Sequence, residues 1–214
     1  MDQTHSSGHR IAGLFLMLGA FSMPFIIIDY VTIMGRLESG STMAERAAFI
    51  KENFDALALG WKFEVIALGL MAAGAMAMIP HRVGVAGWAL AAAGILIAAT
   101  EYPIMLGGYK EVVFAETVDL NTLATLIGTT TVMFYVGGFL YHTGFGIALV
   151  AEALFQEKMT WKVILGIGGL SNLIGGAGFG LAFLGNTAAF TALGPAALPA
   201  FLILGLKGAK LARG

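Results

Sequence analysis

The chain has no cysteine among its 214 residues, and its formal net charge is only −1. The lack of cysteine excludes disulfide bonds, thiolate metal sites and cysteine nucleophiles. The balanced charge gives no sign of the basic surface that binds nucleic acid. The sequence also lacks a His-Glu-x-x-His zinc motif, a Gly-x-Ser-x-Gly nucleophile motif and a phosphate-binding loop, so no cofactor is indicated.

Charge of either sign is scarce. Only 12% of the residues are charged and 58% are hydrophobic, with a mean hydropathy of +0.84. A soluble domain carries about 25% charged residues, so a water-exposed fold of this composition would present large apolar patches. We therefore predict an integral membrane protein, in which the 30 glycines suit close helix packing.

Long hydrophobic runs define the fold class. A membrane-spanning helix needs about 20 mostly apolar residues, and the chain has six such runs. We predict an all-α polytopic membrane helix bundle, a single transmembrane domain over residues 1–214. The predicted spans are 11–34, 57–79, 83–106, 126–150, 162–184 and 190–207. We expect Pro24 to break the first span, and the uncharged stretch 120–151 to form one tilted helix capped by Asn121 or Thr122.

The segment before the second span has a helical pattern. Thr42 and Glu45 fit a capping box at its start. The apolar residues that follow recur at intervals of three and four, which is typical of one face of a helix. They are Met43, Ala47, Ile50, Phe54, Leu57 and Trp61. We expect an amphipathic helix here that lies on the membrane or on a partner.

Lysine and arginine indicate the orientation. With the N-terminus inside, the inner segments carry Arg10, Arg82, Lys158, Lys162, Lys207, Lys210 and Arg213, and most acidic residues fall on the outer half. By the positive-inside rule we predict a multi-pass protein of the inner (plasma) membrane with both termini cytoplasmic.

Several ionisable residues fall inside the predicted spans, where each costs at least about 2.5–3.5 kcal/mol at mid-depth. Asp29, Lys62, Glu64 and Glu101, with Tyr102, lie at a similar outer depth. One interpretation is a polar site that opens to the outer face, with Lys62 paired to Asp29 or Glu101. The interpretation we favour is a set of structural pairs in the headgroup layer that hold three helices together.

Two more polar residues, His142 and Asn172, lie nearer the middle of their spans. We expect each to form a hydrogen bond with a neighbouring helix, since Asn172 belongs to a glycine-rich span in which Gly176 and Gly180 have small-xxx-small spacing. If a metal is bound, the candidate ligands are Glu64, Glu101 and His142.

Three short apolar motifs suggest a family. They are Arg10-Ile11-Ala12-Gly13-Leu14, Gly144-Phe145-Gly146-Ile147-Ala148-Leu149-Val150 and Pro199-Ala200-Phe201-Leu202-Ile203-Leu204-Gly205-Leu206-Lys207-Gly208. With them the chain resembles a broad bacterial family of six-helix integral membrane proteins that is filed as a domain of unknown function. The resemblance implies a six-helix bundle and implies no activity or catalytic residues.

The absence of a catalytic motif favours an accessory or scaffold subunit of a membrane complex. Its partners would be the lipid bilayer and either other membrane subunits or a second copy of the chain. One alternative is a small ion- or proton-coupled transporter that uses the outer polar cluster, with prolines that interrupt its helices. Another is a membrane-embedded metal-dependent enzyme, although the sequence leans against enzymatic activity.

Overall fold

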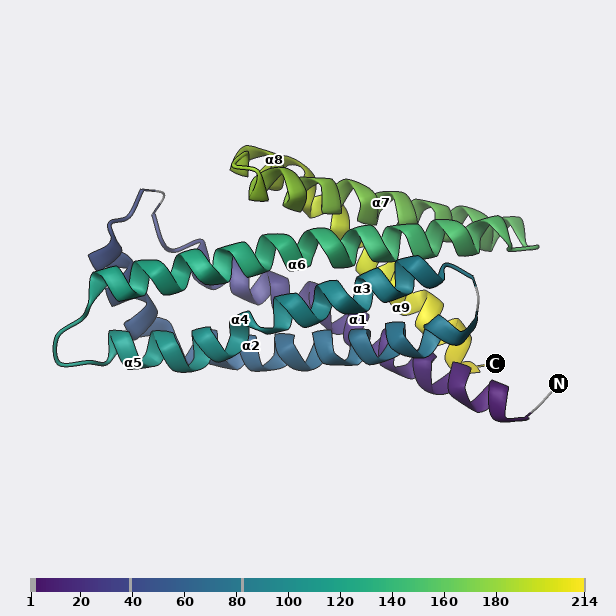
Figure 1. Cartoon of the computed structure of the whole chain (residues 1–214), viewed down its shortest axis with the longest axis horizontal. Helices are drawn as coiled ribbons and strands as arrows, with labels where there is room; N and C mark the ends of the chain where they lie inside the picture. Colours follow the sequence, from purple (N-terminus) through teal and green to yellow (C-terminus); the bar gives the residue numbers. More distant parts are fainter. Residues whose placement is uncertain (1–2, 39, 82, 214) are drawn as a thin grey trace.

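The computed structural model describes residues 3–38, 40–81 and 83–213, with side chains from residue 8 onward except at position 81. All regular elements in this part of the chain are helical (Figure 1). The long helices are α1 (Gln3–Met34), α2 (Met43–Met78), α3 (Val85–Ala99), α6 (Leu120–Leu154), α7 (Met159–Phe183) and α9 (Ala197–Arg213). The short ones are η1 (Ile79–His81), α4 (Glu101–Pro103), η2 (Ile104–Tyr109), α5 (Lys110–Val113), α8 (Thr187–Leu193) and η3 (Gly194–Ala196). Arg82, used above for the orientation, lies outside the described residues.

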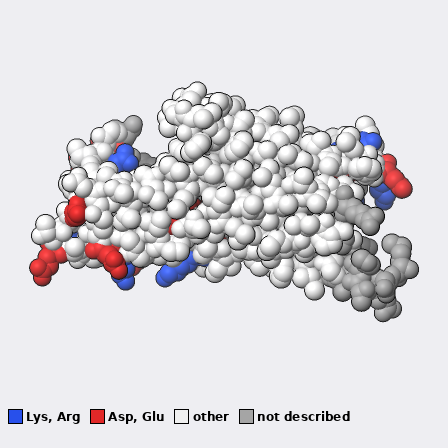
Figure 2. Space-filling view, viewed as in Figure 1, with Lys and Arg blue, Asp and Glu red and all other residues white. Residues whose placement is uncertain are grey.

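Six helical stretches are long and apolar enough to cross a bilayer. They are Gly8–Met34, Met43–Met78, Val85–Val113, Leu120–Leu154, Met159–Phe183 and Thr187–Arg213. Charged side chains gather toward the two ends of the molecule and leave a broad uncharged belt between them (Figure 2). Helix α1 begins and α9 ends at the same end of the bundle (Figure 1). The predicted six-span all-α membrane bundle is therefore confirmed.

The helix predicted before the second span is continuous with that span. Thr42 and Glu45 form the expected capping box, in which the Glu45 N–H donates to the Thr42 hydroxyl and the Thr42 N–H donates to the Glu45 carboxylate. Helix α2 then runs without interruption for 36 residues. It is longer than the roughly 20 residues that a bilayer requires, so its first turns extend beyond the uncharged belt.

The apolar stripe of α2 packs inside this chain, which corrects the expectation that it lies on the membrane or on a partner. From Ala47 to Trp61 every stripe residue is buried. Phe54 packs edge-on against Phe114, and Trp61 packs edge-on against Tyr109, with ring centroids 5.6 and 5.9 Å apart. The end of the third span therefore packs on Phe54 and Trp61 of the stripe, a tertiary contact that periodicity alone does not reveal.

Helix α6 is a single helix of 35 residues, as predicted for the long uncharged stretch. Its cap is Asp119, which corrects the assignment to Asn121 or Thr122. The backbone N–H groups of Asn121 and Thr122 donate to Asp119 Oδ1, at 3.0 and 3.1 Å. Asp is as good an N-cap as Asn, and it stands one residue before the first helical turn.

The prolines have different effects in different spans. Pro24 lies inside an unbroken α1, so the predicted break in the first span is wrong. The last span is interrupted, because the 3₁₀ turn η3, which contains Pro195, separates α8 from α9. The third span is interrupted near Pro103, where α4 gives way to the π-helical segment η2.

Glycines let several helix pairs approach backbone to backbone, and two of these pairs have especially short distances. A Cβ on Gly144 of α6 would lie 2.3 Å from the Ala91 nitrogen of α3. A Cβ on Gly13 of α1 would lie 2.5 Å from the Ala212 nitrogen of α9, and one on Gly208 would lie 2.5 Å from the nitrogen of Met17. These are the close contacts that small residues permit in a bilayer, and they join α3 to α6 and α1 to α9.

Candidate functional site

The third span is irregular where its polar residues lie. Thr100 ends α3, and its hydroxyl donates to the Ile97 carbonyl at 2.5 Å. Pro103 has no N–H to donate to the preceding turn, and the helix then widens into η2. Single π-helical turns within α-helices are frequent at functional sites. Glu101 and Tyr102 lie at this break, and both are buried, with 6% and 1% of their surface exposed.

Glu101 shares its surroundings with a second carboxyl group from α2. Glu64 is half-buried, and its charge interacts with Glu101 and with Tyr102. The Tyr102 hydroxyl faces the Glu64 carboxylate without forming a hydrogen bond of normal geometry to any described residue. Two acidic side chains, one from the second span and one from the third, thus lie close enough for their charges to interact. We call Glu64 and Glu101 the acid pair.

Phenol side chains from three of the six spans lie near the acid pair. Tyr30 of α1 and Tyr141 of α6 interact electrostatically with both carboxyl groups, as Tyr102 does. Tyr109, at the end of η2, interacts with Glu101. Tyr141 is buried, whereas Tyr30 is 38% exposed and lies at the outer edge of the group. The sequence interpretation included Tyr102 alone, although Tyr109 follows it by seven residues, a spacing that would predict one face of a regular α-helix.

A buried hydrogen bond holds the π-helical segment against α6. The hydroxyl groups of Tyr109 and Thr130 lie 2.6 Å apart, and either one can donate. The Thr130 hydroxyl also lies 3.0 Å from the Ile127 carbonyl of its own helix. Because Trp61 packs edge-on against the Tyr109 ring, helices α2 and α6 both fix the position of η2.

The predicted ion pair between Lys62 and either Asp29 or Glu101 is not formed. Lys62 and Asp29 are both exposed, and the single salt bridge among the described residues lies elsewhere. Lys62 follows the buried Trp61 by one residue, which turns it about 100° around the helix and away from the core. The described surroundings of the acid pair therefore contain phenols and apolar groups but no ion-paired cation.

His142 and Asn172 bond to each other across α6 and α7, as predicted for an interhelical hydrogen bond. His142 Nδ1 lies 2.8 Å from Asn172 Oδ1, and the Asn172 amide nitrogen donates to the Gly168 carbonyl at 3.2 Å. Both side chains are buried. A Cβ on Gly176 would lie 3.4 Å from His142 Cβ, so this glycine packs against α6 as expected.

The candidate metal ligands do not come together. Among the described residues, no three histidine or acidic side chains are grouped closely enough to hold a metal ion, so Glu64, Glu101 and His142 do not form a shared site. His142 is instead enclosed by rings: Phe179 and Phe201 have centroids 5.2 and 5.4 Å from its own. The geometry thus corrects the three-residue metal site and leaves the acid pair as the polar centre.

A second polar pair lies toward the opposite end of the bundle and was missed by sequence reasoning. Lys207 of α9 forms a salt bridge with Glu152 of α6, and both residues are buried. Lys210, one turn later, donates to the Gln156 side chain at 3.1 Å and lies over the Trp161 ring. The sequence places both Lys207 and Glu152 on the inner side of the membrane but carries no signal that their helices meet.

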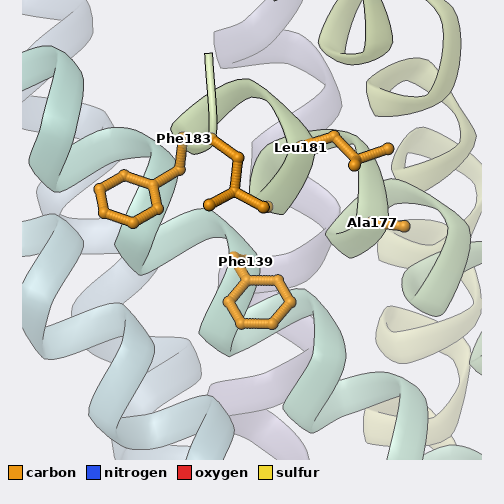
Figure 3. Close-up of a pocket in the computed structure, with 6 residues that line it drawn as sticks. Phe139, Ala177, Leu181 and Phe183 are labelled. Carbon is orange, nitrogen blue, oxygen red and sulfur yellow. The ribbon is translucent and has the colours of Figure 1, made fainter. Parts of the chain in front are cut away.

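Two exposed grooves mark the sides of the bundle. The first has a volume of about 450 Å³ and lies between α6 and α7, where its walls are wholly apolar (Figure 3). Its lining residues are Phe139, Ala177, Gly180, Leu181, Phe183 and Leu184. The second, of about 400 Å³, lies between α1 and α2 and contains Asp29. The first groove offers a surface to acyl chains and carries no group that could do chemistry.

Comparison with known proteins does not assign a family or a function to the chain. No protein-family model, no curated protein and no solved structure matches the chain.

Proposed function

We propose that this protein is a small ion- or proton-coupled membrane transporter in which the acid pair, Glu64 and Glu101, binds the coupling cation. The observation that carries the proposal is a pair of interacting carboxyl groups in the second and third spans, near several phenols and with no ion-paired lysine or arginine among their described neighbours. Intramembrane acids with this character mark ion and proton pathways in many transporters.

The negative charge of the acid pair makes its burial unfavourable. An ionised carboxylate inside a membrane span is costly because it is removed from water, and two like charges in one site repel each other. A proton or a metal cation bound between the two groups removes most of this cost. Since no described side chain supplies that positive charge, it comes from solution.

The proposed location follows from the distribution of basic residues. We place the chain in the inner membrane of a bacterial cell with both termini in the cytoplasm, which puts the acid pair in the outer half of the bilayer. Tyr30 is the partly exposed member of the phenol group, so the cation would enter beside it from the outer side. A carrier with six spans would act as a dimer of this chain.

The accessory-subunit function has less support than it had from sequence. It relied on an apolar stripe free to bind another chain, and residues Ala47 to Trp61 of that stripe are buried within this one. The metal-dependent enzyme also loses support, because its proposed ligands are not grouped.

Infrared spectroscopy tests the proposal on purified protein in lipid nanodiscs. We expect wild-type protein to show the C=O band of a protonated carboxylic acid, which Na⁺ or K⁺ weakens if that cation competes with the proton. Glu64→Gln and Glu101→Gln should each change this band, because each removes one half of the pair. The matched control is Glu52→Gln, an exposed acid on the same helix α2, which should leave the band unchanged.

Flux measurements complete the test. Proteoliposomes that contain a pH-sensitive dye should report proton movement when a Na⁺ or K⁺ gradient is imposed on wild-type protein, and Glu64→Gln and Glu101→Gln should abolish it. If the acid band and the flux are the same in wild-type and both variants, the acid pair does not bind a coupling ion and the proposal is wrong.

A further inference from the structure

The groove between α1 and α2 differs from the other groove in having one charged residue. It is open to the side of the bundle, since Phe25, Phe63 and Ile66 on its walls are 75%, 56% and 59% exposed. Along α1 it runs from Ser22 to Asp29, which corresponds to about 10 Å along a helix axis. Its volume of about 400 Å³ lies within the range of small-molecule sites.

Asp29 carries the negative charge of this groove. Its carboxylate lies over Gly60 of α2, where a Cβ would still be 4.0 Å from Oδ2 and would meet no other atom within that distance. The missing side chain at Gly60 leaves free space below the carboxylate. Lys62 makes no salt bridge with Asp29 in the described structure. An acid on a lipid-facing surface is costly without a cationic partner, so this position suits a positive group from a ligand.

We propose that this groove binds a single-chain amphiphilic cation, such as a long-chain amine or quaternary ammonium compound. The apolar chain would lie between Phe25 and Phe63, and the cationic head would lie on the Asp29 carboxylate. Apolar walls with one placed charge are the usual design of a site that selects an amphiphile by both its chain and its head. The groove binds this ligand by its own residues, whether or not the acid pair couples transport.

The groove and the acid pair occupy different sides of the same helix contact. Asp29 precedes Tyr30 in α1, and Phe63 precedes Glu64 in α2, so each helix gives one residue to the groove and the next residue to the acid pair and its phenols. A ligand that separates α1 from α2 would thus change the surroundings of Glu64. If the proposed transport function holds, the amphiphilic cation is the expected class of substrate.

Photolabelling tests this site. The probe is dodecyltrimethylammonium with a diazirine in its alkyl chain, added to the full chain in phosphatidylcholine nanodiscs. After illumination, mass spectrometry should locate the label on peptides that contain Phe25, Phe63 or Ile66. Unlabelled dodecyltrimethylammonium should compete, and dodecyl sulfate, which has the same chain and the opposite charge, should not.

Variants separate the head contact from the chain contact. Asp29→Asn should reduce competable labelling by about fivefold, because the trimethylammonium head, which has no N–H to donate, loses its ionic attraction to the carboxylate. Gly60→Leu should reduce it by filling the groove. Asp55→Asn, the same change at an exposed position of α2, should have no effect. Glu64→Gln should retain labelling, so failure of the transport proposal would not be confused with failure of this one.

Two results would overturn the inference. One is labelling of Asp29→Asn at the wild-type level while the protein remains monodisperse. The other is equal competition by dodecyl sulfate, which would show that the groove accepts any acyl chain.

Discussion

The salt bridge between Lys207 and Glu152 is expected to respond strongly to the loss of one partner. Both side chains are buried, and Glu152 Oε1 has no hydrogen-bond partner among the described residues, so the contact with Lys207 compensates most of its charge. Lys207→Met removes that compensation and leaves a buried carboxylate. The expected loss in the free energy of unfolding is about 3–5 kcal/mol.

Removal of both charges should have a much smaller effect. Replacing a buried ion pair by apolar residues of similar size is often neutral or stabilising by about 1–4 kcal/mol, because the desolvation cost disappears with the charges. We therefore expect Lys207→Met combined with Glu152→Leu to be at least as stable as wild-type protein. The two substitutions should be strongly non-additive, as expected for residues in contact.

The assay is reversible unfolding in mixed micelles, followed by circular dichroism as the fraction of denaturing detergent is raised. Lys210→Met is the matched control, because Lys210 is one turn away and exposed, so its removal should cost about 1 kcal/mol or less. A loss below about 1 kcal/mol for Lys207→Met, or simple additivity in the double variant, would refute the reasoning.

Three further outcomes are expected. Asn172→Leu should destabilise the protein by about 0.6–1.7 kcal/mol in the same assay, because His142 loses its interhelical hydrogen bond; no loss would contradict this. Gly144→Ala should cost about 1–3 kcal/mol by overpacking, while Gly166→Ala, whose Cβ meets nothing within 4 Å, should cost nothing; equal effects would contradict the close approach. Hydrogen bonds from Thr122 lower the pKa of Asp119 below its ordinary value of 3.8. The stabilisation that the ionised Asp119 carboxylate gives to the start of α6 is therefore complete above pH 3.8. It is lost as the pH falls through the lowered pKa of Asp119. Hydrogen exchange should show the start of α6 fraying there, and not in Asp119→Asn.

Local features of the fold could be predicted because they depend on neighbours in sequence. Thr42 and Glu45 are three residues apart, so their capping box follows from spacing. The single helix α6 follows from the lack of a turn signal in an uncharged run. The bond between His142 and Asn172 was expected in kind, since a polar group in a bilayer seeks a partner on another helix.

Features that depend on which helices meet could not be predicted. The pairing of Lys207 with Glu152 requires α9 to lie against α6, and the burial of the Phe54 and Trp61 stripe requires the third span to fold over α2. An ion pair of Lys62 was considered because its depth in the membrane matches that of Asp29 and Glu101. The direction in which Lys62 points around the axis of α2 was not taken into account. The sequence predicts Glu64 and Glu101 as two acids at a similar depth. That Tyr30 and Tyr141 lie near them is seen only in the tertiary structure.

The glycine contact between α1 and α9 has a consequence for biosynthesis. Chains enter the membrane from the N-terminus, so α1 is inserted while its partner is still being synthesised. The backbone surface around Gly13 must therefore remain facing lipid, or a temporary occupant, until α9 arrives. The contact between α1 and α9 can therefore form only after α9 has been inserted. A bulky residue at Gly13 or Gly208 would prevent this contact even when the other spans are in place.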